Sequence, residues 1–405
     1  MNQVTEVGQC TIITGDNLET LRLMPDSSVH CCVTSPPYYA LRDYKMPGQA
    51  GLEATPEEYI ACMVTLFREL RRVLRDDGTF WLNLGDSYAA NRGYQVPDSK
   101  HVDVGNSKGA SVPPGLKVKD MIGIPWRVAL ALQADGWYLR AAAPWLKRNA
   151  MPESAKDRPT TVVEYFFLLT KTTKYYYDGA AVKVPYTKPL DRYGGPAKKV
   201  TEALKEGSPQ GRVRRTSDWF VESWQGMLGD DDGYPLALVV NPQGYPGAHF
   251  ATFPPKLVEP CILAGTSEKG ACPHCGAPWV RMVEKGAPDL AHQQACGGDA
   301  NGAYDGQSTK DYAAAGAQDA SATKARILAG MKETVTTGWL PTCACPAHDP
   351  APCVVIDPFG GAATTGLMAN RHNRNSIMLE LNPEYVALAA ARLQTDLEKQ
   401  SGRPR

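Results

Sequence analysis

The 405-residue sequence has no excess of either charge and no long hydrophobic run. Lysine and arginine together number 43, as do aspartate and glutamate, so any charge that binds a nucleic acid must be local. No apolar stretch approaches the roughly 20 residues that span a bilayer, and the N-terminus lacks the charged-then-apolar pattern of a signal peptide. We therefore expect a soluble, cytoplasmic protein.

The sequence also lacks the cysteine spacing of a secreted disulfide framework, although it contains 11 cysteines. Five of them lie in apolar surroundings and are expected to be small core residues: Cys10, Cys31, Cys32, Cys62 and Cys261.

Two close cysteine pairs near the C-terminal part predict a metal site. Cys272 and Cys275 form a Cys-x-x-Cys knuckle followed by glycine, and Cys343 and Cys345 form a Cys-x-Cys pair. Such a knuckle lets two thiolates grip one tetrahedral ion, so the four cysteines predict a structural Zn²⁺ without an open position for catalysis. A redox pair and simple surface thiols are the alternatives, and His348 could replace one thiolate.

The segment Thr34-Ser35-Pro36-Pro37-Tyr38 follows the apolar run from Val29 to Val33, which reads as a strand that stops at a rigid loop. The prolines fix φ and remove backbone donors, so the Ser35 hydroxyl and the neighbouring carbonyls are presented as acceptors beside the Tyr38 ring. Acceptors next to a stacking ring suit a flat heterocycle with an exocyclic amino group. A polyproline-like loop or linker is the alternative.

A second motif begins with the apolar run Val354 to Ile356 and continues as Asp357-Pro358-Phe359-Gly360-Gly361, before a helical pattern from Leu367. Glycine permits a tight turn and a close approach to a ligand, and a helix N-terminus offers free N–H groups. The next strand, Ser376 to Leu379, ends in Glu380, which is placed to accept hydrogen bonds from ribose hydroxyls. An ordinary solvated strand end is the alternative for Glu380.

These two motifs resemble those of the amino-group DNA methyltransferases that use S-adenosylmethionine. Thr34 to Tyr38 resembles their catalytic loop and Asp357 to Gly361 their cofactor loop, and this order resembles the beta arrangement. In that family Ser-Pro-Pro-Tyr is typical of cytosine-N4 enzymes and Asp-Pro-Pro-Tyr of adenine-N6 enzymes. The sequence departs from the family at Ala363, where glycine is usual; a methyl group can be tolerated there if φ is negative.

The resemblance implies an α/β, Rossmann-like core with a mixed, mostly parallel sheet. It implies that Ser35 and the Pro36 carbonyl accept the hydrogens of a cytosine amino group, and that Tyr38 stacks on the flipped base before direct in-line transfer. The expected catalytic residues are Ser35, Pro36, Pro37 and Tyr38. The expected cofactor contacts are Asp16, Thr34, Asp357, Pro358, Phe359, Gly360, Gly361, Thr364, Thr365 and Glu380. For Asp16 the alternative is a helix N-cap.

Five segments are expected from this comparison. Residues 1–179 form the catalytic half of the core, 180–240 a target-recognition region, and 241–270 a helix leading to the cofactor loop. Residues 271–352 form a zinc-knuckle insertion with a flexible linker or small helix in its middle, and 353–405 the cofactor-binding half.

Double-stranded DNA is the expected partner. The segment after Ala180 is rich in basic residues interleaved with aromatic ones, and basic side chains neutralise phosphates. The predicted DNA contacts are Lys147, Asn149, Arg212, Arg214 and Arg215. For the region around Trp145 and Lys147 a core β-hairpin with one buried tryptophan is the alternative, and for the basic segment a solvated loop.

Two other functions compete with a cytosine-N4 enzyme. One is an adenine-N6 methyltransferase with an atypical serine, and the other is a catalytically weak, zinc-containing DNA-binding protein. A cognate restriction endonuclease is the expected partner protein, and the chain is expected to be a monomer or a homodimer.

Overall fold

The computed structural model describes residues 3–89, 112, 115–147, 157–158, 161–182, 238–239, 253–288 and 332–402. The chain divides into two compact units. The first contains residues 1–181, 237–278 and 343–405, and the second contains residues 182–236 and 279–342.

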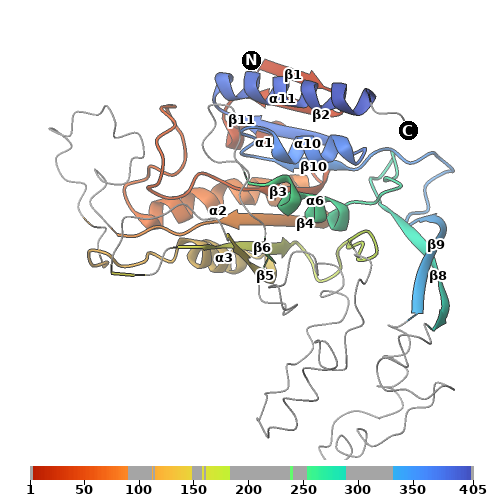
Figure 1. Ribbon diagram of the computed structural model, residues 1–405, viewed down its shortest axis with the longest axis horizontal. Helices are drawn as coiled ribbons and strands as arrows, with labels where there is room; N and C mark the ends of the chain where they lie inside the picture. Colours follow the sequence, from red (N-terminus) through yellow and green to blue (C-terminus); the bar gives the residue numbers. More distant parts are fainter. Residues whose placement is uncertain are drawn as a thin grey trace, which may run out of the picture. The chain divides into compact units, whose positions relative to one another are not determined.

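The first unit is built on a nine-stranded sheet with the order β1-β2-β11-β10-β3-β4-β6-β5-β7 (Figure 1). The strands are β1 Gln3–Val7, β2 Cys10–Thr14, β3 Val29–Thr34, β4 Leu74–Leu84, β5 Tyr138–Leu146, β6 Val163–Thr170, β7 Leu238–Val239, β10 Val354–Asp357 and β11 Asn375–Glu380. The five strands from β2 to β4 in this order pair in parallel, whereas β1 and β6 pair antiparallel to their neighbours. The predicted mixed, mostly parallel α/β sheet is confirmed.

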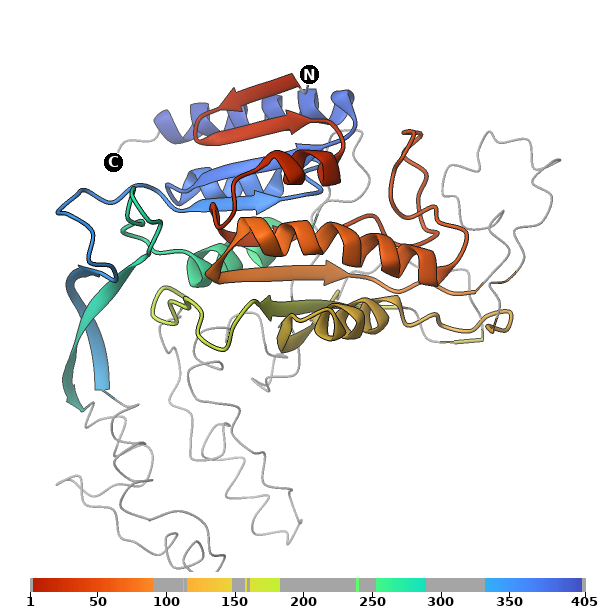
Figure 2. The ribbon, with the colours of Figure 1, turned by 180° about the vertical axis from the view of Figure 1, so that it is seen from behind.

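Helices cover both faces of this sheet, as Figures 1 and 2 show from opposite sides. One face carries α1 Asn17–Leu23, α2 Pro56–Val73 and α3 Ile124–Ala134, and the other carries α6 Pro255–Gly265, α10 Thr364–Arg371 and α11 Pro383–Ser401. This three-layer arrangement buries both faces of the central strands, which explains why β3 is mostly apolar and buried at every position.

Local sequence sets the ends of the longest of the first three helices. Thr55 accepts a hydrogen bond from the N–H of Glu58, whose side chain bonds back to the N–H of Thr55, and Pro56 stands at the first helical position. The apolar side of α2 places Tyr59, Phe67 and neighbouring residues in the core. The capping residues and this apolar side therefore fix where α2 begins and which side it buries.

The crossovers bring the carboxyl ends of β2, β11, β10 and β3 to one edge of the sheet. In parallel α/β sheets ligands bind outside this edge. Ser35, Asp357, Glu380 and Asp16 all stand at or just beyond the ends of these strands.

The second unit contains an antiparallel hairpin formed by β8 Trp279–Pro288 and β9 Lys332–Pro341. The segment 271–352 therefore has strands on both sides of its middle, for which a linker or small helix stays the prediction. Residues 289–331 lie outside the described residues.

One cysteine differs from the prediction. Cys62 is exposed on α2, whereas Cys10, Cys31, Cys32 and Cys261 are buried as expected. The hydrophobic surroundings of Cys62 in the sequence belong to the buried side of an amphipathic helix, which Cys62 itself does not share.

Among the described residues no helix has both the length and the apolar character needed to cross a membrane.

Candidate active site

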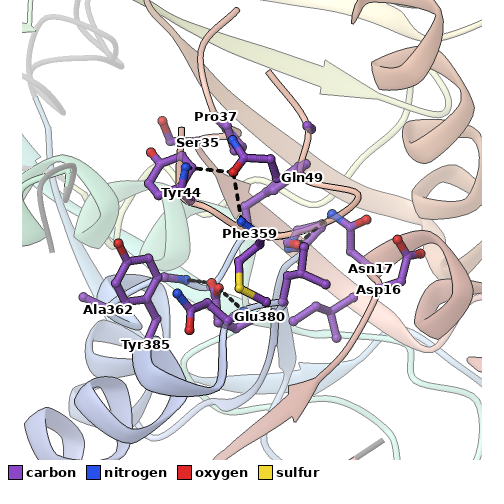
Figure 3. A pocket seen from close by; sticks show the side chains of 18 of the residues that line it. Asp16, Asn17, Ser35, Pro37, Tyr44, Gln49, Phe359, Ala362, Glu380 and Tyr385 are labelled. Carbon is purple, nitrogen blue, oxygen red and sulfur yellow. Dashed lines mark hydrogen bonds between the residues drawn. The ribbon is translucent and has the colours of Figure 1, made fainter. Parts of the chain in front are cut away.

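A pocket lies at the carboxyl edge of the parallel strands and has a volume of about 900 Å³, including space open to solvent (Figure 3). Ser35 and Pro37 line it from the loop after β3, and Phe359, Gly360 and Gly361 line it from the loop after β10. The two motifs, 323 residues apart at Thr34 and Asp357, therefore share one cavity. The pocket is also lined by Asp16, Pro358, Thr364 and Glu380.

Asp357 lies beneath the pocket and joins the two loops. Its carboxylate accepts hydrogen bonds from the hydroxyls of Thr34 at 2.6 Å and Thr365 at 2.9 Å, and from the N–H of Phe359 at 3.0 Å. Its side chain is 1% exposed, and burial raises its pKa to about 7. Thr34, Asp357 and Thr365, which were expected to contact a cofactor, do not line the pocket; they hold the two loops together from below.

Glu380 holds the cofactor loop by its backbone. One carboxylate oxygen accepts from the N–H of Gly361 and the other from the N–H of Asn382, both at 2.8 Å. Burial raises the pKa of this carboxyl. A Cβ at Gly360 would lie 2.9 Å from the Cβ of Met378, so glycine is required for the loop to approach β11 this closely.

Asp16 is the N-cap of α1, and its contact with a cofactor stays a prediction. Its Oδ1 accepts from the N–H of Glu19 at 2.8 Å as the N-cap of α1, and the residue also lines the pocket. The Nδ2 of Asn17 donates to the carbonyl of Pro358 at 3.1 Å. The start of α1 is therefore tied to the cofactor loop.

Ala363 does not meet the condition under which alanine was expected to be tolerated. It has φ 53° and ψ 43°, in the left-handed region, and is completely buried at the N-cap of α10. A residue with a Cβ loses about 1–2 kcal/mol in this conformation. The turn keeps it because the N–H of Ala363 donates to the carbonyl of Gly360 at 2.7 Å.

The catalytic loop is held by side chains. The Ser35 hydroxyl donates to Oδ1 of Asn83 at 3.1 Å, and the Tyr38 hydroxyl lies 2.6 Å from Oε2 of Glu164. Lys147 forms an ion pair with the other carboxylate oxygen of Glu164. Burial and the charge of Glu164 raise the pKa of Tyr38 well above its ordinary value, so its hydroxyl is a donor. Neither Pro36 nor Tyr38 lines the pocket.

The hairpin considered as an alternative for the region of Trp145 is present. β5 and β6 pair antiparallel, Trp145 is buried, and the Lys147 ammonium lies 4.6 Å from the centre of the Trp145 ring. Asn149, Arg212, Arg214 and Arg215 lie outside the described residues.

Sequence reasoning missed one wall of the pocket, the loop that contains Tyr44, Met46 and Gln49. Oε1 of Gln49 accepts from the N–H of Tyr44 at 2.7 Å, and the Tyr44 ring meets the edge of the Tyr385 ring with centroids 6.3 Å apart. Signals of an ordered turn there are the dipeptide Pro47-Gly48 and Gly51, and the two glycines have φ values of 78° and 97°.

The four cysteines of the predicted metal site come together in the first unit. The sulfurs of Cys272, Cys275, Cys343 and Cys345 all lie within 4.8 Å of one another. His348 is next to this group, with Nδ1 3.9 Å from the sulfur of Cys272.

The backbone of the Cys272–Gly276 turn is bound to the core sheet. Nη1 of Arg75 donates to the carbonyl of Cys275 at 2.6 Å, and Nε2 of His30 lies 2.9 Å from the carbonyl of Gly276. Burial lowers the pKa of His30 to about 4. The neutral ring accepts from the N–H of Val354 at Nδ1, so Nε2 carries the proton and donates to Gly276.

A family model described as DNA methylase, of the N6/N4 methyltransferases, matches residues 29–272 and 353–391. The chain belongs to this DNA methylase family. The two matched ranges leave out residues 273–352, close to the predicted insertion.

Three relatives are similar over much of the chain. The Type II methyltransferase M.Cfr9I of Citrobacter freundii is 35% identical over 96% of this chain and 89% of its own. M.XycI of Xanthomonas campestris pv. cyanopsidis is 37% identical over 95% and 87%, and M.SmaI of Serratia marcescens is 41% identical over 64% and 77%.

Proposed function

We propose that this DNA methylase transfers a methyl group from S-adenosylmethionine to the N4 amino group of cytosine at specific sites in double-stranded DNA. The observation that carries the proposal is the shared pocket, in which Ser35 faces the same cavity as the glycine turn after β10. The relatives' description as Type II methyltransferases supports a place in a restriction-modification system with a cognate restriction endonuclease. The chain would act as a monomer or a homodimer.

The lining of the pocket fits the proposed cofactor. Two carboxylates, Asp16 and Glu380, line it, and none of the described lining residues is lysine or arginine, which favours a cationic ligand. Glu380 would accept hydrogen bonds from ribose hydroxyls, and Asp16 one from the adenine amino group. When bound, S-adenosylmethionine supplies an electrophilic methyl group on its sulfonium.

Ser35 would provide the acceptor for the target amine. Because its proton is donated to Asn83, the lone pairs of its oxygen remain free to accept an amino hydrogen. The lone pair of a cytosine amino nitrogen is delocalised into the ring, so accepting its hydrogens favours a pyramidal, more nucleophilic nitrogen. The residue is serine rather than aspartate, which supports cytosine over adenine through the family resemblance. Holding the amino nitrogen in line with the methyl group of the cofactor would supply the rest of the rate enhancement.

Mass spectrometry of nucleosides from DNA incubated with the protein tests this function. N4-methylcytosine is the expected product. N6-methyladenine would overturn the assignment of the base, and unmodified DNA that is nevertheless bound would overturn the activity. Sequencing of the modified positions would then identify the recognition site.

We propose that residues 180–240 recognise the target, with phosphate and base contacts from Arg212, Arg214 and Arg215 and further contacts from Asn149. Arginine is suited to both, since its guanidinium can bind phosphates and guanine edges. Residues 1–179 and 353–405 would be the two halves of the core, joined through the 241–270 helix region.

We also propose that Cys272, Cys275, Cys343 and Cys345 hold a structural Zn²⁺. A tetrahedral ion with Zn–S bonds of about 2.3 Å needs sulfurs about 3.8 Å apart, and the four sulfurs lie within 4.8 Å of one another. Four protein ligands leave no position for a substrate, so this ion would take no part in methyl transfer. It would hold together the base of the 271–352 insertion, whose strands β8 and β9 begin and end beside the two cysteine pairs.

Elemental analysis of the purified protein tests the metal. About one zinc per chain is expected, and Cys275→Ser should lower this content while Cys62→Ser, at an exposed cysteine outside the cluster, should not. A folded wild-type protein without zinc would contradict the proposal.

A further inference from the structure

We propose that Glu164 is a positioning residue that sets the direction of the Ser35 hydroxyl through Tyr38 and Asn83. This inference rests on the proposed function of Ser35 and adds a residue to it. Glu164 stands at the start of β6, beside the end of β4 that carries Asn83, because Leu84 pairs with Tyr165. It is 9% exposed and does not line the pocket.

Two hydroxyl groups compete for one acceptor in this network. Oδ1 of Asn83 lies 3.1 Å from the Ser35 hydroxyl and 3.0 Å from the Tyr38 hydroxyl. The Asn83 amide is oriented by its Nδ2, which donates to the carbonyl of Tyr165 at 3.2 Å, so Oδ1 must face the catalytic loop. Oδ1 has two lone pairs and can accept from both hydroxyls, but sharing one acceptor weakens each bond, so Ser35 is held most firmly while Tyr38 donates elsewhere.

Glu164 decides this competition. A hydroxyl has one proton, and Tyr38 lies closer to Oε2 of Glu164, at 2.6 Å, than to Asn83. Hydrogen bonds to a carboxylate are roughly twice as strong as neutral ones, so Tyr38 donates to Glu164. Asn83 is then left to Ser35, whose proton points away from the pocket and whose lone pairs point toward the target amine.

The surroundings fix Glu164 in this role. Lys147 pairs with Oε1, and Oε2 accepts from Tyr38 at 2.6 Å and more weakly from Nδ2 of Asn83 at 3.4 Å. Gly85 allows the Tyr38 ring to approach, since a Cβ at position 85 would lie 2.5 Å from that ring and 3.2 Å from Glu164. The carboxylate and the phenol therefore have little freedom to rearrange.

Glu164→Gln should reverse the arrangement with almost no change of shape. The amide oxygen would accept a hydrogen bond from the Lys147 ammonium in place of the ion pair, and the amide NH₂ would face the Tyr38 hydroxyl. Tyr38 would then donate to Asn83, which weakens the hydrogen bond of Ser35 to the same oxygen. We expect the single-turnover rate of methyl transfer from tritiated S-adenosylmethionine to unmethylated genomic DNA to fall about 10- to 100-fold. The affinity for S-adenosylmethionine should change less than about two-fold, because Glu164 does not line the pocket.

The decisive measurement is a rescue. Tyr38→Phe removes the competing hydroxyl, so Glu164→Gln/Tyr38→Phe should methylate faster than Glu164→Gln alone and reach within about three-fold of Tyr38→Phe. A merely structural Glu164 would give a double variant no faster than the single one. Glu57→Gln, in a surface ion pair with Arg127, is the matched control.

Each result separates this inference from the proposed function. If Ser35→Ala kept the full rate, the proposed function would be wrong. If Ser35→Ala were inactive while Glu164→Gln kept the full rate, or if Tyr38→Phe gave no rescue, only the role of Glu164 would be overturned. Should Glu164→Gln fail to fold, Glu164→Ala compared with Glu164→Ala/Tyr38→Phe gives the same test.

Discussion

The two loops that meet in the pocket are held in different ways. The cofactor loop is bound mainly through its backbone, because the N–H groups of Phe359 and Gly361 donate to the carboxylates of Asp357 and Glu380. The catalytic loop is bound through side chains, because Ser35 and Tyr38 reach Asn83 and Glu164 on two other strands. The first arrangement depends on backbone shape and the second on the identity of several residues.

This difference suggests that the two loops contribute separately to cofactor binding and to catalysis. Apart from Asp357, the cofactor loop depends on backbone conformation rather than on its own side chains, which suits a cofactor that all members of a family share. A loop bound by side chains can change its chemistry by substitution at Asn83 or Glu164 without disturbing the cofactor loop. Substitutions on the two sides should therefore separate catalysis from cofactor binding.

The largest effect should come from the catalytic side. Ser35→Ala removes the proposed acceptor and should lower the rate of methyl transfer about 10²- to 10³-fold, as expected for one preorganised polar group. Its affinity for S-adenosylmethionine, measured by calorimetry, should stay within about two-fold of wild type. Ser401→Ala, at the exposed end of α11, is the control. If Ser35→Ala lowered the rate and the affinity for S-adenosylmethionine equally, the two loops would not have separate roles.

The cofactor side should respond in the opposite way. Glu380→Gln places an amide NH₂ against one of two backbone N–H donors and should weaken S-adenosylmethionine binding about 10- to 100-fold, since hydrogen bonds to charged groups contribute roughly 1.5–3 kcal/mol. Equilibrium binding measures this change. With saturating cofactor the rate should largely recover. The exposed Glu384 nearby gives the matched Glu384→Gln control. A rate that stays low at saturation would contradict the backbone role.

Asp357 should make stability depend on pH. Because its folded pKa, about 7, exceeds the ordinary value of 3.8, its stabilising contribution is present below about pH 4 and is lost as pH rises through 7. The free energy of unfolding of the wild type, measured by urea denaturation, should therefore fall between pH 4 and 7. This fall should be smaller in Asp357→Asn. We expect a moderate effect, since Thr34, Thr365 and Phe359 already favour the charged form. A wild-type curve that rises over this interval would show that Asp357 stays ionised.

The smallest effect should come from Ala363→Gly. Removing the left-handed strain gains about 1–2 kcal/mol, while losing a buried methyl group costs about 0.8 kcal/mol. The net gain in the free energy of unfolding should be at most about 1 kcal/mol, measured by urea denaturation. Ala362→Gly, at a residue without positive φ, should instead destabilise. A destabilised Ala363→Gly would mean that the methyl group packs better than its burial suggests.

Much of the cofactor side could be predicted from the sequence because its signals are local. An apolar run followed by glycines predicted the turn after β10, and Glu380 is the last residue of the next strand, β11. Ser35 was predicted in the same way, from an apolar run that ends in two prolines. The strand pairing that brings these loops together then follows from parallel α/β topology.

The support of the catalytic loop could not be predicted because its contacts are distant in sequence. Asn83 and Glu164 meet only because β4 and β6 pair antiparallel in one register, and nothing local specifies that register. The positive φ of Ala363 was missed for a related reason, since the turn geometry overrides the preference of the residue. The same holds for Tyr44, which reaches the pocket through a loop shaped by Gln49.

The pairing of β3 with β10 also has a consequence during synthesis. Cys31 and Cys32 lie beside Val355 and Ile356, so one edge of the mostly apolar strand β3 stays unpaired in a chain leaving the ribosome until β10 has been translated. The nascent chain is therefore prone to aggregation during most of its synthesis. The pocket cannot form before β10 and β11 have been translated, because the loops after these strands line it. Methyl transfer therefore has to wait for the same strands.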